Sequence, residues 1–101
     1  MSAALALARS YRVAIRFADL GDWGDCELLS EYDPRAPEIR INERFAARLP
    51  DTQRAEFVAR AVGHELYHHR EQIGEIPTLH DRAARESAAE RFARELLELA
   101  P

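Results

Sequence analysis

The stretch "TQRAEFVARAVGHELYHHREQI", residues 52–73, decides the fold, because it is the longest part of the chain that reads as one helix. It contains no proline, and Asp51 in front of it is a good N-cap. Gly74 is expected to end the helix, and Pro77 prevents an immediate restart. Side chains at helical spacing share one face of it: Phe57, Ala61, His64 and His68.

Shorter elements are expected before this helix. A short alanine-rich helix with Ser2 as its cap is predicted at residues 2–9. Apolar and polar residues then alternate, and the chain has Gly/Asp-rich and Pro-bearing turns, as is typical of short strands. Three strands are predicted at residues 11–18, 26–32 and 38–42.

A last helix is predicted from residue 82 onward, with Thr78 or Asp81 as its cap. The chain thus has a helix, three strands and two longer helices, which predicts one small α+β domain over residues 1–101 with an antiparallel or mixed sheet. The expected buried stripe of the last helix is Ala89, Phe92, Ala93, Leu96 and Leu97.

Composition excludes several classes of protein. The net charge is −4 and no Arg-rich run occurs, so direct binding of nucleic acid is not expected. The single cysteine, Cys26, allows no internal disulfide and fits a reducing compartment. Arginines interrupt the apolar start of the chain, which argues against a signal peptide or membrane span and favours the cytoplasm. Every basic residue is arginine, a bias typical of GC-rich bacterial genomes.

The pentad His64-Glu65-Leu66-Tyr67-His68 matches the pattern H-E-x-x-H. Positions i and i+4 of a helix lie one turn apart on the same face, so His64 and His68 can bind one metal ion. Zinc in such a site lowers the pKa of its water toward ~7, and Glu65 is close enough to accept the proton. The pattern therefore predicts a zinc site with its own general base.

A catalytic zinc needs a third protein ligand. The metzincin pattern fails, because Glu71 and Gly74 stand where it requires glycine and histidine. His80 follows the helix and could fold back toward the metal. Glu86 begins the face of the last helix that should pack against the helix before it, where a carboxylate is costly unless it is paired or bound to metal. The residues leave His80 and Glu86 open as the third ligand.

Three blocks of the sequence resemble the ImmA/IrrE family of bacterial metallopeptidases. The blocks are "IRIN" (39–42), "HELYHH" (64–69) and "ESAAERFARELL" (86–97), in that order. The resemblance implies a small zincin-like fold of the gluzincin type, one zinc ion per chain and Glu65 as general base. The ligands that it implies are His64, His68 and Glu86.

The resemblance also implies a partner and shows two departures. Members of the family are expected to cut or bind a helix-turn-helix repressor. Glu90 stands where the family prefers Asn or Asp, at a position expected to orient a ligand histidine. The chain ends soon after Leu97, as in a near-minimal version of the fold.

Several other residues allow less specific interpretations. Tyr67 could donate a hydrogen bond to an oxyanion, although packing on the sheet is expected. His69 could contact substrate or the final helix, although a solvated side chain is the simpler account. The strand "EIRIN" (38–42) is a candidate edge strand for pairing with an extended peptide. Cys26 is expected to be a small buried hydrophobe, and Trp23 either covers a core edge or offers an exposed contact.

Three functions fit these observations. The first is a zinc-dependent peptidase with a protein or peptide substrate. The second is a catalytically inactive member that keeps the metal and acts as a regulatory or binding module. The third is a helical protein in which the pentad is a coincidence and no metal is bound.

Overall fold

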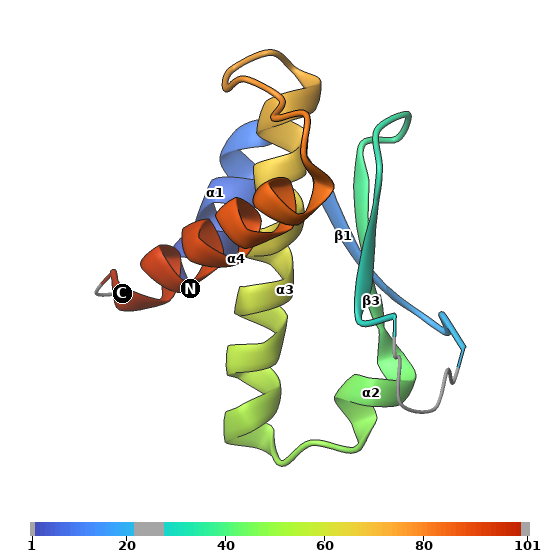
Figure 1. The fold of residues 1–101 in the computed structure, drawn as a ribbon. Helices are drawn as coiled ribbons and strands as arrows, with labels where there is room; N and C mark the ends of the chain where they lie inside the picture. Colours follow the sequence, from blue (N-terminus) through green and yellow to red (C-terminus); the bar gives the residue numbers. More distant parts are fainter. Residues whose placement is uncertain (1, 22–27, 100–101) are drawn as a thin grey trace.

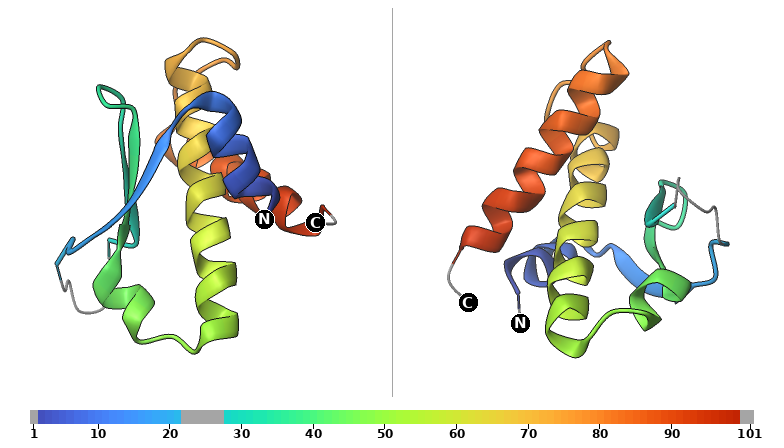
Figure 2. Two further views of the ribbon diagram at one scale, coloured as in Figure 1. Left: turned by 180° about the vertical axis from the view of Figure 1, so that it is seen from behind. Right: turned by 60° about the horizontal axis from the view of Figure 1, so that its bottom comes forward.

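The computed structural model describes residues 2–21 and 28–99, so the expectations for Trp23 and Cys26 lie outside the described residues. Its central element is α3 (Asp51–Gln72), which has the sheet on one side (Figure 1). The helices α1 (Ala3–Tyr11) and α4 (Arg82–Glu98) pack against α3 away from the sheet (Figure 2). The protein is thus a small α+β domain, as predicted, in which one helix is covered on several sides.

The sheet is mixed and has the strand order β1-β3-β2. β1 (Ala14–Ala18) pairs in parallel with β3 (Glu38–Asn42), and β2 (Ser30–Asp33) pairs with β3 in antiparallel fashion. The prediction that the segment 38–42 is an edge strand is wrong, because β3 has a partner on each side. β2 is instead the outer strand that contacts α3.

Alternation along β3 separates the core from the charged face of the sheet. Ile39 and Ile41 are fully buried and belong to the same core cluster as Val62 and Leu66 of α3. Arg40 lies between them on the other face. There it forms ion pairs with three carboxylates of the sheet, those of Glu31, Asp33 and Glu38. The period of two along this strand therefore decides which face meets α3.

The first helix is longer than predicted and the first strand shorter. Ser2 caps α1 as expected, since its side chain accepts a hydrogen bond from the backbone N–H of Leu5. The helix continues to Tyr11 and ends at Arg12, whose φ of 59° is left-handed. The alternating pattern from residue 11 onward therefore begins inside a helix, and β1 starts only at Ala14.

The sequence did not predict α2 (Glu43–Ala47), a short helix that follows β3 directly. Its N-cap is Asn42, a fully buried residue whose side-chain oxygen accepts from the backbone N–H of Arg44 at 3.2 Å. The amide nitrogen of Asn42 donates to the carbonyls of Gly21 and Leu28, at 3.0 and 2.9 Å. One side chain thus begins α2 and joins two distant points of the chain.

The sequence predicted three ends of the long helices, at Asp51, Gly74 and Asp81, and two of these predictions are confirmed. Gly74 follows the last turn of α3 with a φ of 76°, and Asp81 caps α4 through the N–H groups of Ala83 and Ala84. The prediction that Asp51 caps α3 is wrong, because the cap is Pro50 and Asp51 is the first helical residue. Across the described residues, no helix has the length and apolar character needed to cross a membrane.

The contact between α3 and α4 is made by small residues. Ala89 and Ala93 of α4 are fully buried, as the predicted stripe requires. A Cβ atom added to Gly63 would lie 3.0 Å from the Cα atom of Ala93 and 3.2 Å from its Cβ. The two helices therefore pack almost backbone to backbone at this point.

Replacing Gly63 with alanine adds a methyl that meets the backbone of α4, which is expected to cost about 1–3 kcal/mol. Helix propensity offsets about 1 kcal/mol of this cost, so the free energy of unfolding is expected to fall by up to about 2 kcal/mol. Urea denaturation followed by circular dichroism measures it. Ala55→Gly, at an exposed position of α3, measures the propensity effect alone. A Gly63→Ala protein that gains as much free energy of unfolding as Ala55→Gly loses would contradict the close contact.

Candidate metal site

Two histidines of α3 and one glutamate of α4 lie close together beside the contact between these two helices. Nε2 of His64 lies 2.9 Å from Oε2 of Glu86, and Nε2 of His68 lies 3.3 Å from Oε1 of the same carboxylate. One ligand atom from each of the three side chains lies within 4.8 Å of the other two. The structure thus brings together the three ligands expected from the resemblance. His80, the alternative third ligand, is exposed and is not part of this cluster.

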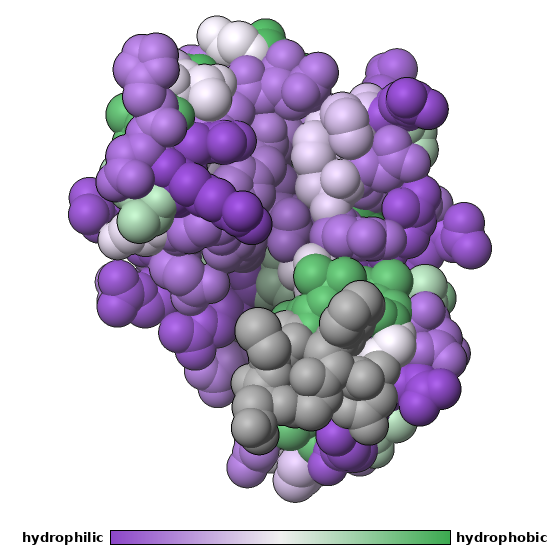
Figure 3. All heavy atoms as spheres, turned by 45° about the vertical axis from the view of Figure 1, so that its right-hand side comes forward, coloured by the Kyte–Doolittle hydropathy of each residue, from purple (hydrophilic) through white to green (hydrophobic). Residues whose placement is uncertain are grey.

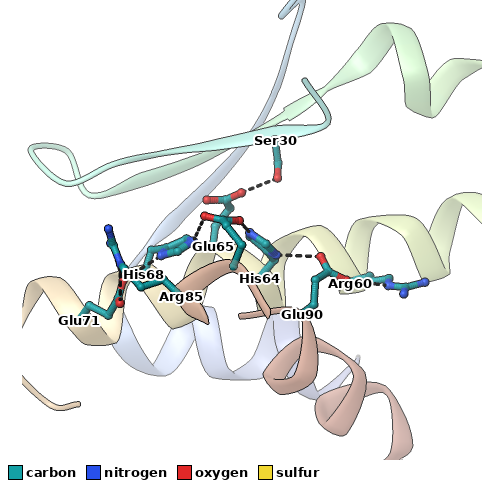
Figure 4. A network of polar contacts seen from close by, with 9 residues as sticks. Ser30, Arg60, His64, Glu65, His68, Glu71, Arg85 and Glu90 are labelled. Carbon is teal, nitrogen blue, oxygen red and sulfur yellow. Dashed lines mark hydrogen bonds and ion pairs between the residues drawn. The ribbon is translucent and has the colours of Figure 1, made fainter. Parts of the chain in front are cut away.

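A further carboxylate binds the Nδ1 atom of each histidine (Figure 4). Nδ1 of His64 donates to Oε1 of Glu90 at 2.8 Å, which is the orienting contact expected of Glu90. Nδ1 of His68 donates to Oε1 of Glu71, also at 2.8 Å. Both imidazoles therefore direct Nε2 toward Glu86 and are fixed in that orientation.

Glu71 has a role that the sequence did not indicate. Its side chain is only 3% exposed and accepts two hydrogen bonds from Arg85, at 3.0 and 2.9 Å. These bonds are the largest cause of the lowered pKa of Glu71, so the carboxylate stays ionised beside His68. Arg85 directly precedes Glu86 in α4, and the same ion pair therefore also fixes the start of that helix.

Glu65 lies on the side of α3 that faces the sheet and is 7% exposed. The hydroxyl of Ser30 in β2 donates to Oε2 of Glu65 at 2.6 Å (Figure 4). Burial raises the pKa of Glu65, while the Ser30 bond and the charges of His64 and His68 act against that rise. A carboxyl group of this kind suits proton transfer. The contact with Ser30 joins residues far apart in sequence, and no local pattern signals it.

Two further predictions were wrong. His69 is not solvated: it is 6% exposed and shares a hydrogen bond of 2.7 Å with the hydroxyl of Tyr32 through Nδ1. Burial lowers its pKa, and the rings of Tyr11 and Tyr32 contact it edge-on. The ring of Tyr67 contacts Phe92 of α4 and His68 of its own helix, whereas packing on the sheet was expected.

A cleft of about 700 Å³ opens beside the site. It runs between β2, α2 and the amino-terminal half of α3, with α4 at its other wall. His64, Glu65 and Glu86 lie at one end of it. This volume is in the range of sites that bind small molecules or segments of peptide. Its other described lining residues are Leu29, Ser30, Phe45, Leu49, Gln53, Glu56, Phe57, Arg60, Ala61 and Glu90.

The three clustered side chains fit a divalent metal by their chemistry. Two imidazole nitrogens and one carboxylate oxygen are the donor set of one class of catalytic zinc site, and this set also accommodates manganese or iron. The bonds from Nδ1 to Glu90 and Glu71 are those that ligand histidines usually make with their second nitrogen. Comparisons with protein-family models, curated proteins and solved structures found no match to this chain.

Replacing Tyr32 with phenylalanine is expected to lower the free energy of unfolding by about 1–3 kcal/mol, because Nδ1 of the buried His69 loses its partner. Tyr11→Phe is the matched control. Tyr11 also contacts the ring of His69, but its hydroxyl binds Glu75 in an exposed place, and the expected loss is below about 1 kcal/mol. Chemical denaturation of both variants measures the difference. Equal losses would show that the bond to His69 contributes nothing particular.

Proposed function

We propose that this protein is a zinc-dependent peptidase of the gluzincin type. The ligands would be His64, His68 and Glu86, with Glu65 as the general base. The observation that carries the proposal is the orientation of the histidines: both direct Nε2 toward one carboxylate while other carboxylates hold Nδ1. An ordinary surface pair of histidines would not require this arrangement from three separate acidic side chains.

The chain's own residues supply the proton transfers of peptide hydrolysis. Zinc in such a site would act as a Lewis acid and make water a stronger nucleophile near neutral pH. Within the described residues, Ser30 holds Oε2 of Glu65, which leaves Oε1 to accept a proton from the attacking water. Glu65 then gives this proton to the leaving amine.

An extended peptide is the substrate that best suits the surroundings of the site. β2 is an outer strand of the described sheet, and its residue Ser30 lies directly at Glu65. A peptide that adds to the outer edge of such a strand gains backbone hydrogen bonds. We propose that the substrate binds along β2 and passes over the cleft beside α3.

The resemblance to ImmA/IrrE peptidases supports the same proposal and adds a partner. It favours a zincin-like classification of the fold and a helix-turn-helix repressor as substrate, in a bacterial cytoplasm. The contact between Glu90 and His64 is consistent with this resemblance, because Glu90 occupies the position expected to orient a ligand. The blocks that carry the resemblance contain the residues of the site.

Two variants separate metal binding from catalysis. The protein purified without a histidine tag is expected to contain about one zinc per chain by elemental analysis. Glu86→Ala should lose most of this zinc, because it removes a ligand. Glu65→Gln should keep the zinc and lower the rate of cleavage of a repressor substrate by roughly 10²–10⁴-fold, because the general base is gone.

Glu95→Gln, on an exposed part of α4, is the control for both readouts. Zinc bound to the wild type without any cleavage, in a protein whose repressor binding survives Glu65→Gln, would indicate a regulatory module instead of a peptidase. Absence of zinc from the wild type would contradict the proposed site altogether.

The contact of Glu71 with His68 gives a separate prediction. Glu71→Gln is expected to weaken zinc binding by roughly 10- to 100-fold, because the amide holds His68 less firmly and does not raise its basicity. Competition against a chromophoric chelator measures the dissociation constant. Glu75→Gln makes the same chemical change at an exposed position just beyond α3. If the two variants bind zinc equally well, Glu71 has only a structural role.

A further inference from the structure

Five described residues of the cleft lining are apolar, and the part of the cleft that they line is called the apolar end. Leu29 from the segment before β2, Phe45 from α2 and Leu49 form its walls together with Phe57 and Ala61 of α3. Ala61 precedes His64 by three residues and Phe57 by seven, so they lie about 4.5 and about 10 Å from it along the helix axis. The apolar end therefore begins within one helical turn of the candidate metal ligands.

The walls of this apolar end are built by packed elements. The rings of Phe45 and Phe57 contact each other at a centroid distance of 4.8 Å, which joins α2 to α3. The guanidinium of Arg48 covers the ring of Phe45 at 5.4 Å. Leu29 remains 40% exposed at the opposite wall. Figure 3 shows an apolar patch near the middle of this side of the molecule, in a surface that is otherwise mostly hydrophilic.

An apolar lining in a concave site usually marks a place for a ligand. The polar lining adds a preference of charge. The described lining residues include four carboxylates, those of Glu56, Glu65, Glu86 and Glu90, and one guanidinium, that of Arg60. Arg60 lies 3.7 Å from Glu90 and is thus already partly neutralised. Because the proposed zinc would offset Glu65 and Glu86, the carboxylates that disfavour an acidic group in the cleft are those of Glu56 and Glu90.

We propose that the apolar end of the cleft receives one bulky aromatic or branched aliphatic side chain of the bound peptide, from a residue next to the scissile bond. This inference rests on the proposed function, because it takes the bond to be cleaved as lying at the zinc ligands. The specificity-determining residues are Leu29, Phe45, Leu49 and Phe57. Peptides with a small or acidic residue at that position bind poorly.

Three small zinc-directed probes test the pocket without any need for a known substrate. They are the hydroxamates of N-acetylphenylalanine, N-acetylglycine and N-acetylglutamate, each titrated by calorimetry into the zinc-loaded wild type. Phenylalanine hydroxamate is expected to bind roughly 10- to 100-fold tighter than glycine hydroxamate, because its ring leaves water. Glutamate hydroxamate should bind no better than the glycine compound.

Variants on two sides of the pocket locate the preference. Leu49→Ala removes apolar wall and should reduce the phenylalanine preference about fivefold to tenfold. Leu79→Ala, at an exposed leucine outside the described cleft lining, should leave it unchanged. Ala61→Leu fills the pocket next to His64 and should reduce the same preference while glycine hydroxamate still binds. Zinc content and circular dichroism identify any variant that has not folded.

The outcomes distinguish this inference from the proposed function. A wild-type protein that binds zinc and all three hydroxamates equally overturns the side-chain pocket and leaves the peptidase proposal standing. If neither folded pocket variant changes the preference for phenylalanine, the aromatic ring binds elsewhere. This outcome also overturns the pocket. A wild-type protein that binds no zinc overturns the proposed function and this inference with it.

Discussion

The contact of Gly63 with Ala93 determines how close α4 can come to α3, and the position of Glu86 follows from it. Gly63 directly precedes His64, and Glu86 lies seven residues before Ala93, about two helical turns away. A side chain at Gly63 would meet the backbone of α4, not a flexible group that can move aside. Because Gly63 has no Cβ atom, α4 can lie close to α3, and this closeness sets the distance between Glu86 and His64.

The two carboxylates that bind the Nδ1 atoms of the histidines each have an arginine partner. Glu71 is almost fully buried and accepts two bonds from Arg85, so this pair works in an environment of low dielectric constant. Glu90 and Arg60 are each about half exposed and lie 3.7 Å apart, an interaction that solvent largely screens. His68 is thus held by a stiff contact inside the protein, and His64 by a contact at its surface.

The sequence predicted the elements whose pattern is local. Long runs of residues at helical spacing identified α3 and α4, and alternation identified β3 with its observed bounds. The pairing of His64 with His68 is a property of any helix. The buried stripe of α4 made Glu86 one candidate beside them, with His80 as the other, and the resemblance to a known family favoured Glu86. α2 has only five residues, which is too short for a periodic signal.

The errors arose where several elements meet. α3 has the sheet, α1 and α4 around it, so its buried residues lie on more than one face, and His69 is among them. The expectation that His69 lies on a solvated face therefore fails for this helix. The contact of Ser30 with Glu65 and the central place of β3 both depend on the order of strands in the sheet. That order is set by tertiary packing, and a short run of residues contains no pattern that indicates it.

The buried amide of Asn42 has a consequence for which side chains this position can accept. Its nitrogen donates to the carbonyls of Gly21 and Leu28, and its oxygen accepts from the backbone N–H of Arg44, so the side chain both gives and receives hydrogen bonds. A carboxylate of the same shape has no N–H group to give and would leave the two carbonyls without this donor. Aspartate begins helices as well as asparagine does in general, but it is therefore a poor substitute at this N-cap.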